Sequence, residues 1–359
     1  MAYLKDGNDK YMAKNKTLLK ANTAKQDEFY TTYDAIQEEL NYYEDQLKGK
    51  VILCNCDDPF ESNFCKFFMR NFNYLKLKRL ICTSYSGSSI VGTQLSLFDE
   101  YHEPLTNNHG YVLDIHEIPM TNGRGISDND INWILHQKNI VKRLKGNGDF
   151  RSKECVNYLK QADIVVTNEP FSLFREYTKQ LFNYHKQFLI IGNMNNITYK
   201  ETFPLLKNNL MWLGINHGDM KFTVPNNYMP RKTRFWIDKN GQKWRSFGNI
   251  CWFTNLDYEQ RHKDLILYKS YSKKEYLKYD NFDAIEVSKV ADIPMDYSGI
   301  MGVPITFLDK YNPDQFEIIG LDRYTVPKEK LVGGRLSING KTKYARILIK
   351  NKKVQKIGN

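Results

Sequence analysis

Short apolar runs of strand length alternate with helical patterns between residues 25 and 216 of this 359-residue chain. The runs are apolar throughout, which is typical of strands buried on both faces of a sheet. Strands separated by helices predict an α/β fold with a doubly wound, mostly parallel sheet, whose ligands bind beyond the carboxyl ends of the strands. The predicted strands lie at 50–56, 80–84, 111–115, 163–167, 188–192 and 211–215, with a weaker one at 118–120. The predicted helices lie at 25–47, 62–73, 153–161, 171–184 and 197–208.

The composition and the periodicity of the sequence change after about residue 217. Pro, Gly, Asn and aromatic residues become more frequent, helical periodicity fades, and short strand signals appear at 221–224, 250–254 and 345–350. We therefore predict three parts. These are a flexible basic arm at 1–24, a catalytic α/β domain at 25–216, and an irregular β-rich lobe at 217–359.

The net charge of +11 and the pI near 9.1 favour a polyanionic partner. Residues 331–359 contain eight basic residues and no acidic one, and the N-terminal stretch is also rich in lysine. Either tail alone is equally consistent with a solvated chain end. Both together, on a basic chain, favour contacts with phosphates.

The six cysteines form no CxxC pair and no zinc spacing, and several stand inside apolar runs. This pattern predicts small buried hydrophobic residues in a reducing compartment. The seven histidines are scattered, so we expect no metal site. With no signal peptide and no apolar run near 18 residues in length, the sequence predicts a soluble cytoplasmic protein.

The most informative segment is a buried strand, 163–167, that ends in Asn168, Glu169, Pro170 and Phe171. Amino-group methyltransferases carry Asn/Asp-Pro-Pro-Phe/Tyr at this place. The chemical need is clear, because the lone pair of an exocyclic amine is delocalised into its ring. An amide oxygen and a main-chain carbonyl that accept the two amine hydrogens favour a more nucleophilic nitrogen. Taken alone, the short string equally describes a turn that ends a strand.

Long segments in the same order resemble the EcoRI-type adenine-specific DNA methyltransferases, and the resemblance runs from about residue 25 to 353. The matching segments are 27–31, 55–59, 148–152, 163–177, 252–257, 301–307 and 346–350. The resemblance implies a Rossmann-like class I methyltransferase sheet with a C-terminal DNA-recognition lobe. It also implies S-adenosylmethionine as cofactor, a flipped-out adenine in double-stranded DNA as substrate and a monomeric state. The enzyme works either beside a cognate restriction endonuclease or as an orphan methyltransferase.

The resemblance implies three groups of cofactor-binding residues. The first packs on the methionine part, the second follows the first strand and binds polar groups, and the third holds the adenine. In that order, these residues are Phe29 or Tyr30; Asp57, Asp58 and Pro59; and Asp149 with Phe150. The alternatives are a helix start for the first group, a helix N-cap for Asp58, and a simple turn for the third.

The resemblance also implies that Asn168 and the carbonyl of Glu169 hold the target amine while Phe171 stacks on the flipped base. Trp252 or Phe253 is a candidate second stacking wall, and a core aromatic is the alternative. No helix-turn-helix or zinc-finger signature is present. The candidate DNA-binding cations, each individually consistent with ordinary surface charge, are Arg231, Lys232, Arg234, Lys243 and Arg245.

Glu169 departs from the family pattern, which has proline at this place. Pro170 restricts the residue before it to extended conformations, so the carbonyl of Glu169 can keep its direction. Loss of the first proline loosens the loop by roughly 0.4–1 kcal/mol. We expect an active adenine-N6 methyltransferase, with a weakened or inactive DNA- and cofactor-binding protein as the alternative. An RNA or protein methyltransferase is disfavoured, because the resemblance includes the C-terminal lobe.

Overall fold

The computed structural model describes residues 29–355 apart from 59, 61, 86–108, 122, 124, 138, 225 and 227. The predicted arm at 1–24 and the candidate residue Pro59 lie outside the described residues. The chain forms two compact units, each made from two stretches of sequence. The first contains the residues up to Asn193 together with Asn216–Trp252, and the second contains Met194–Ile215 together with the residues after Trp252. Within the folded part of the chain, after the arm, the sequence predicts one boundary near 216, so the two divisions differ.

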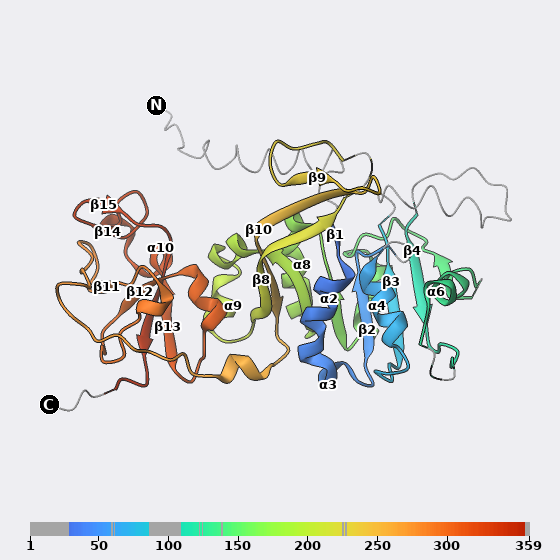
Figure 1. The fold of residues 1–359 in the computed structure, drawn as a ribbon, viewed down its shortest axis with the longest axis horizontal. Coiled ribbons are helices and arrows are strands. Elements are labelled where there is room, and N and C mark those ends of the chain that lie inside the picture. The colour runs from blue at the N-terminus through green and yellow to red at the C-terminus, as the bar shows by residue number, and fades with distance from the viewer. Residues whose placement is uncertain are drawn as a thin grey trace, which may run out of the picture. The chain divides into compact units, whose positions relative to one another are not determined.

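The first unit is built on a ten-stranded sheet in the order β1-β8-β10-β7-β6-β2-β3-β4-β5, with β9 paired to β10 (Figure 1). Its centre is four parallel strands, which are β7 (Gln187–Asn193), β6 (Ile164–Thr167), β2 (Val51–Asn55) and β3 (Arg79–Thr83). The side chains of these strands are almost all buried, as their continuous apolar runs predict. The chain runs outward from β2 to β3, then returns to pair β6 on the other side of β2. A topological switch point therefore lies between β2 and β6, which is where open α/β sheets bind ligands.

Antiparallel strands flank this parallel centre. On one side β4 (Tyr111–Ile115) pairs with β3 and β5 (Val141–Arg143) pairs with β4. On the other side β1 (Tyr30–Thr31) pairs with β8 (Trp212–Thr223), and β9 (Phe235–Ile237) pairs with β10 (Lys243–Thr254). The α/β class is thus confirmed, and the sheet is mixed, with parallel pairs at its centre and antiparallel pairs in its flanks.

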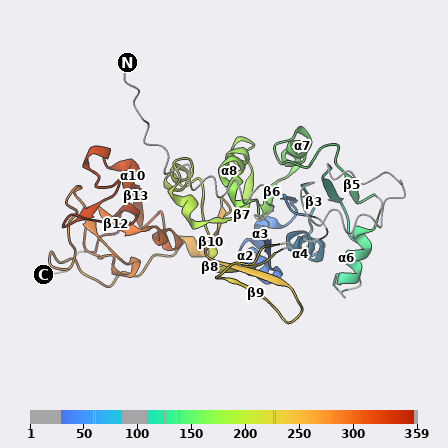
Figure 2. The same ribbon diagram turned by 90° about the horizontal axis from the view of Figure 1, so that it is seen from above.

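Helices cover both faces of the sheet, as in a doubly wound fold. In Figure 2, α2 (Tyr33–Leu40), α3 (Glu44–Leu47) and α4 (Asn63–Asn71) lie on one face, and α7 (Lys153–Gln161) and α8 (Phe174–Asn183) lie on the other. Side-chain caps begin three of these helices: Thr32 accepts from Ala35, Ser62 from Phe64 and Cys65, and Ser152 from Cys155.

Some helices differ from the sequence prediction. The helix expected at 25–47 is broken, because a 3-10 turn (Asn41–Tyr43) separates α2 from α3. Near the β4 edge lies α6 (Asp128–Leu135), which the sequence analysis does not predict although a capping box formed by Ser127 and Asp130 begins it. Among the described helices, none combines the length and the hydrophobicity needed to span a lipid bilayer.

Strands β8 and β10 are each 12 residues long, and their far ends form a ribbon with β9. The strand signals at 211–215 and 221–224 belong to one strand, β8, and the signal at 250–254 is the end of β10. The ribbon extends beyond the sheet on the side of β1 (Figure 1). Because β1 leads into α2 and pairs with Phe222 and Thr223, this is also the side of the loops that follow β2 and β6.

The second unit contains a four-stranded sheet in the order β11-β12-β16-β13 and a separate pair, β14 and β15. Only β11 and β12 are parallel. The strands are β11 (Ile285–Glu286), β12 (Met301–Pro304), β13 (Phe316–Leu321), β14 (Ser337–Ile338), β15 (Lys341–Thr342) and β16 (Arg346–Asn351). Short helices complete it: η4 (Met194–Thr198), α9 (Phe203–Lys207), η5 (Glu259–His262), η6 (Val290–Asp292), η7 (Ile305–Lys310), α10 (Asp322–Thr325) and η8 (Lys328–Lys330).

Candidate active site

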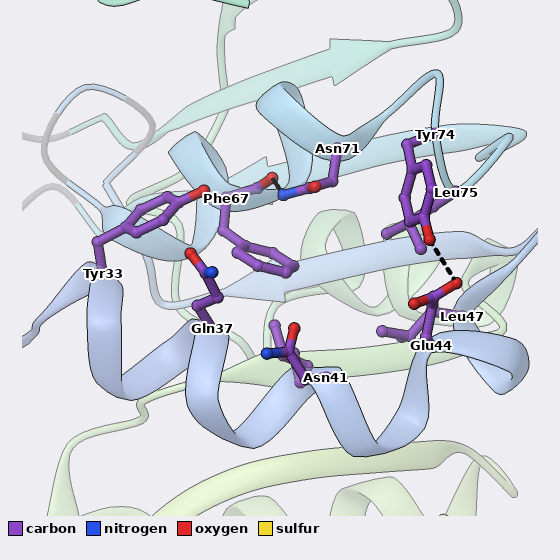
Figure 3. Close-up of a pocket in the computed structure, with 10 residues that line it drawn as sticks. Tyr33, Gln37, Asn41, Glu44, Leu47, Phe67, Asn71, Tyr74 and Leu75 are labelled. Carbon is purple, nitrogen blue, oxygen red and sulfur yellow. Dashed lines mark hydrogen bonds between the residues drawn. The ribbon is translucent and has the colours of Figure 1, made fainter. Parts of the chain in front are cut away.

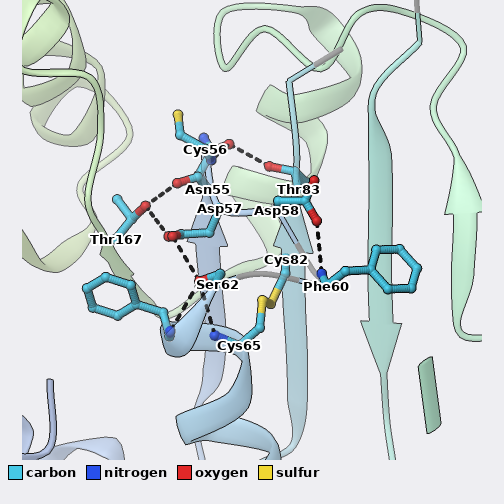
Figure 4. Close-up of a disulfide and its surroundings, with 11 residues drawn as sticks. Asn55, Cys56, Asp57, Asp58, Phe60, Ser62, Cys65, Cys82, Thr83 and Thr167 are labelled. Carbon is cyan, nitrogen blue, oxygen red and sulfur yellow. Dashed lines mark hydrogen bonds between the residues drawn. A yellow bond between two sulfur atoms is a disulfide. The ribbon is translucent and has the colours of Figure 1, made fainter. Parts of the chain in front are cut away.

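The loops after β2 and β6 meet at the switch point of the sheet. The hydroxyl of Thr167, the last residue of β6, donates to the carbonyl oxygen of Asn55 and to Asp57 Oδ2, the latter at 2.6 Å. Ser62 Oγ donates to Asp57 Oδ1 at 2.9 Å, and Thr83 Oγ1 donates to Asn55 Oδ1 at 2.6 Å (Figure 4). The two loops to which the sequence assigns chemistry are therefore joined by hydrogen bonds.

Asp57 lies at the centre of this network. Burial raises the pKa of Asp57 to about 7, although hydrogen bonds from Thr167, Ser62 and the main-chain N–H of Asn168 act to lower it. The neighbouring Asp58 is buried and accepts a 2.9 Å hydrogen bond from the main-chain nitrogen of Phe60. Since Ser62 caps α4, the N-cap alternative for Asp58 is wrong.

The same region corrects the expectation that every cysteine is free. A disulfide joins Cys65 of α4 to Cys82 of β3, and both residues are buried (Figure 4). The remaining four cysteines form no disulfide, and three of these, Cys54, Cys155 and Cys251, are buried.

Asn168 presents an open acceptor. Its amide nitrogen donates to the carbonyl oxygen of Phe29 at 2.6 Å. Its amide oxygen, Oδ1, is buried and has no hydrogen-bond partner in the part of the chain that the structure describes. A buried acceptor without a donor is uncommon, because it forfeits its hydrogen bonds to water. The arrangement can therefore accept an N–H from a bound group.

Glu169 is only 1% exposed, and neither of its carboxylate oxygens is hydrogen-bonded to another described residue. Burial, together with the charge of Asp57, raises the pKa of Glu169 well above its ordinary value. The hydroxyl of Tyr177 in α8 and the side chain of Asn55 are also buried and lie close to each other, since a hydrogen bond with Asn55 acts to lower the pKa of Tyr177. The pKa of Tyr177 is raised by burial and then by Cys56, Glu169 and Asp57, so these groups share one small volume.

Aromatic side chains from distant segments surround Phe171. The ring of Phe29 stacks on it with centroids 5.6 Å apart and an interplanar angle of 23°. Phe222 of β8 and Phe247 of β10 lie edge-on to Phe171 at 6.4 and 6.3 Å. The ring of Phe29 also lies edge-on to that of Tyr228, with centroids 6.1 Å apart. The structure thus places Phe29 beside the catalytic motif, while Tyr30 belongs to β1 and is half-buried.

Asp149 and Phe150 lie before α7. The Asp149 carboxylate accepts two hydrogen bonds from the Arg151 guanidinium, at 2.9 and 2.7 Å, and these hold the pKa of Asp149 below its ordinary value. Phe150 is buried and meets Tyr177 edge-on, with ring centroids 5.1 Å apart. Gly148, with φ +77°, lies so close to the carbonyl of Ser84 that a Cβ would stand 1.9 Å from that oxygen. This contact brings the turn to the end of β3 and requires glycine.

The candidate DNA-binding cations lie on the ribbon and the loop that joins β8 to β9. Lys243 Nζ donates to the carbonyls of Asn226 and Tyr228 at 2.5 and 3.2 Å, so it holds this loop. Arg245 Nη1 donates to the carbonyls of Thr233 and Arg234 at 2.6 and 3.0 Å. The side chain of Arg234 pairs with Asp219 at 2.6 Å.

The other two cations of this group, Arg231 and Lys232, are exposed. The guanidinium of Arg231 lies over the ring of Tyr228, 5.9 Å from its centroid. Trp252, unlike these cations, lies in the core. It is 0% exposed and packs edge-on against Phe64, 6.0 Å between centroids, so no ring face is open to a base. The geometry favours the core alternative for this residue.

A cavity of about 110 Å³ lies between α2–α3 and α4, away from the switch point (Figure 3). Its lining includes Tyr33, Phe67 and Tyr74 but no residue of the loops after β2 and β6. Across the described residues, no group of three or more His, Cys, Asp or Glu side chains is placed to hold a metal ion.

Comparison with known proteins identifies the family. The profile described as "Adenine-specific methyltransferase EcoRI" matches residues 17–352. The chain belongs to this family.

Curated relatives of this EcoRI-type methyltransferase match along nearly their whole length. It is 47% identical to the Type II methyltransferase M.EcoRI of Escherichia coli, over 96% of this chain and 99% of that protein. It is 37% identical to M.MgeORF184P of Mycoplasma genitalium, over 93% and 98% of the two chains, and 36% identical to M.MpnI of Mycoplasma pneumoniae, over 93% and 97%. No solved structure matches it significantly.

Several residues of the candidate site are absent from the sequence prediction. Asn55, Thr167 and Tyr177 are among them, and so are Phe222 and Phe247 of the aromatic cluster. A signal existed for Thr167, the polar end of an apolar strand, and for Phe222, which alternates with the buried Met220 and Val224. No local signal identifies Phe247 or Tyr177, because only the folded chain brings them to the loops.

Proposed function

We propose that this chain transfers the methyl group of S-adenosylmethionine to the N6 amine of a flipped-out adenine in double-stranded DNA. The observation that carries the proposal is Asn168 Oδ1, a buried acceptor without a partner among the described residues at the switch point, next to an aromatic residue, Phe171. In this role the chain is the modification half of a restriction-modification system and works as a monomer beside a cognate endonuclease.

The residues of the motif account for the chemistry of the amine. Asn168 Oδ1 accepts one N6 hydrogen and the carbonyl of Glu169 accepts the other, which localises the lone pair on nitrogen. Phe171 stacks on the adenine ring and holds it against rotation. The nitrogen lone pair forms the new N–C bond, and one of the two N6 protons then leaves to solvent. The bound cofactor supplies the electrophilic methyl group.

The residues present fit such a cofactor. Asp57 and Asp58 stand after β2 for its polar groups, and Asp149 with Phe150 stands at the end of β3 for its adenine. The buried carboxylate of Glu169, beside these loops, has no hydrogen-bond partner among the other described residues. Asp149 binds a donor in addition to Arg151, because a carboxylate offers about four lone-pair sites. The strand order, with β2 central and the switch between β2 and β6, supports a Rossmann-like class I fold.

The polyanionic partner is inferred from charge. The ribbon of β8, β9 and β10 extends on the side of the catalytic loops, and it carries the exposed cations Arg231 and Lys232. Cations on that side of the sheet can bind the phosphates that flank a flipped base. The second unit, to which residues 253–355 belong, is the proposed site of sequence recognition. Its basic residues are partly used internally, since Arg346 pairs with Glu286 and Lys353 with Asp264.

One observation favours a second candidate, a weakened or inactive protein that still binds DNA and cofactor. Glu169 replaces proline in the motif, and its carboxylate is buried without a partner in the described part of the chain. A buried, uncompensated carboxylate destabilises the loop that holds Asn168.

The test uses the purified chain, labelled S-adenosylmethionine and unmethylated duplex DNA of known sequence. Label recovered as N6-methyladenine at one recurring site supports the proposal. Asn168→Ala is expected to reduce transfer by about 10²–10³-fold, the loss typical of one pre-organised polar group. Asn168→Asp is the matched control, because it keeps an acceptor oxygen in the same place. Binding of both ligands without any transfer by the unaltered chain would establish the second candidate.

A further inference from the structure

Three buried polar groups converge beside Asn168, and one of them, the carboxylate of Glu169, has no hydrogen-bond partner among the other described residues. The carboxylate of Glu169 is 1% exposed, the side chain of Tyr177 is 0% exposed and that of Asn55 is 1% exposed. Each comes from a different element: the loop after β6, helix α8 and the end of β2. The side chains of Tyr177 and Asn55 lie close to each other, since a hydrogen bond with Asn55 acts to lower the pKa of Tyr177. Buried polar atoms in folded proteins are nearly always satisfied, so the Glu169 carboxylate indicates a ligand group that belongs beside it.

The charge of the surroundings defines that group. Glu169 and Asp57 are both carboxylates, and the charge of Glu169 also raises the pKa values of Cys56 and Tyr177, which are not cations. No cation of the chain is hydrogen-bonded to the Glu169 carboxylate among the described residues. A buried carboxylate in such a place is stabilised by a cation, and a buried charge otherwise gives up its ionised form.

The position of Glu169 in the motif narrows the choice of cation. Asn168 holds the reacting amine, so the atom that carries the methyl group must lie a few Å beyond that amine. That atom is a sulfonium, which bears a positive charge but offers no N–H or O–H. A carboxylate needs no such donor to stabilise it, because the attraction between the two charges has little directionality.

We propose that Glu169 is the counter-charge for the sulfonium of the methyl donor and makes this chain discriminate between the donor and its demethylated product. The inference rests on the proposed function, which supplies the donor. Proline, the family residue at this position, has no charge and cannot act in this way.

The discrimination follows from the charge change in the reaction. Transfer breaks the S–C bond, leaves its electron pair on sulfur, forms the N–C bond from the nitrogen lone pair, and releases one proton from that nitrogen. The sulfur is then neutral and Glu169 has lost its partner. Glu169 accordingly takes up a proton from solvent, and the product binds more weakly than the donor. Binding of the donor to the protonated free site should conversely release a proton, which binding of the product should not.

The test is calorimetric binding of S-adenosylmethionine and S-adenosylhomocysteine, each in two buffers of different ionisation enthalpy. The unaltered chain should prefer the donor and release protons with the donor only. Glu169→Gln, which keeps the shape, should reduce the donor-to-product affinity ratio by about 10-fold or more and abolish the proton release, 10-fold being about 1.4 kcal/mol. Glu169→Pro, the family residue, should behave like Glu169→Gln, and it provides a second variant if the glutamine variant does not fold.

The exposed Glu117→Gln serves as the matched control and should keep both the ratio and the proton release. An unchanged ratio in Glu169→Gln and Glu169→Pro would overturn the inference and leave the proposed function standing. Failure of the unaltered chain to bind either ligand would overturn both. Since binding is measured without DNA, the result does not depend on whether the chain is catalytically active.

Discussion

The amide nitrogen of Asn168 donates a 2.6 Å hydrogen bond to the carbonyl oxygen of Phe29, while the Phe29 ring stacks on Phe171. Phe29 thus stacks on Phe171, as is proposed for the target adenine. Its carbonyl accepts from Asn168 Nδ2, which leaves Oδ1, the proposed acceptor for the adenine amine, without a partner among the described residues. The Phe29 ring and the adenine cannot share one face of Phe171. In the free chain, the Phe29 ring therefore covers one face of Phe171 on which a base could stack.

Replacement of Phe29 should consequently speed the entry of the base. With the methylation site established, a duplex carrying 2-aminopurine at the target position reports base flipping by its fluorescence. Phe29→Ala should raise the rate of the fluorescence change several-fold in stopped-flow mixing, because the ring no longer has to leave. Tyr74→Ala, at an exposed position, is the control. A slower or unchanged rate would mean that Phe29 moves away freely or supports the base instead of competing with it.

The raised pKa of Asp57 predicts a pH-dependent contribution to stability. Its ordinary pKa lies near 4 and its folded pKa is about 7, so the folded chain binds a proton more tightly than the unfolded chain. The stabilisation is fully present below about pH 4 and is lost as pH rises through 7. Asp57→Asn removes this component, so its Tm relative to the unaltered chain should rise by a few degrees between pH 4 and 8.

The comparison uses the pH trend because the Asp57→Asn variant also loses a hydrogen bond from Thr167 or Ser62, a loss that is constant with pH. Asp45→Asn, at an exposed helix position, should give a Tm difference that hardly changes with pH. If the Asp57→Asn difference is equally flat, the carboxyl of Asp57 titrates near its ordinary value.

The sequence predicts the part of this site that depends on local pattern. Apolar runs identify β2 and β6, and the polar residues at their ends, Asp57 and Asn168, follow from the rule that ligands bind at carboxyl ends. The contact between these two loops follows as well, because parallel neighbours end at the same edge of a sheet. These features depend on strand length and burial, which a single sequence records.

The features of the fold and the site that the sequence does not predict depend on contacts between distant segments. The antiparallel direction of β4 could not be predicted, because the apolar Tyr111–Ile115 run indicates a strand but not whether it pairs parallel or antiparallel with its neighbour. The aromatic cluster combines Phe29, Phe171 and Phe247, which are separated by more than 70 residues at each step. Trp252 is flanked by strand-like residues, and its burial depends on Phe64 of another element. Likewise, the sequence alone predicts Lys243 and Arg245 as surface charges. Their main-chain carbonyl partners come from other segments, and no sequence pattern identifies them.

The cations of the ribbon should differ in their effect on DNA binding. Lys232 is exposed, so Lys232→Ala should reduce the magnitude of the slope of log K against log salt by about 0.9, the value for one phosphate contact. Lys243 holds the carbonyls of Asn226 and Tyr228, so Lys243→Ala should weaken binding by loosening the loop, with a smaller change in slope. Fluorescence anisotropy across a series of salt concentrations measures both. An unaltered slope in Lys232→Ala would remove this residue from the DNA interface.

The buried pair of Arg346 and Glu286 should dominate the stability of the second unit. Both side chains are less than 10% exposed, and their Nη2–Oε1 distance is 2.6 Å. Burial acts to raise the pKa of Glu286, but hydrogen bonds from Arg346 and Tyr279 outweigh it and hold that pKa below its ordinary value. Glu286→Gln leaves the guanidinium buried without a counter-charge, which costs about 3–5 kcal/mol. Urea unfolding at pH 7 should show this loss, and the difference should shrink as pH falls through the folded pKa of Glu286, where the unaltered chain loses the pair too.

Asp283→Asn, which breaks an exposed pair with Lys278, should cost less than about 1 kcal/mol. Equal losses in the two variants would mean that the buried pair contributes no more than a surface one.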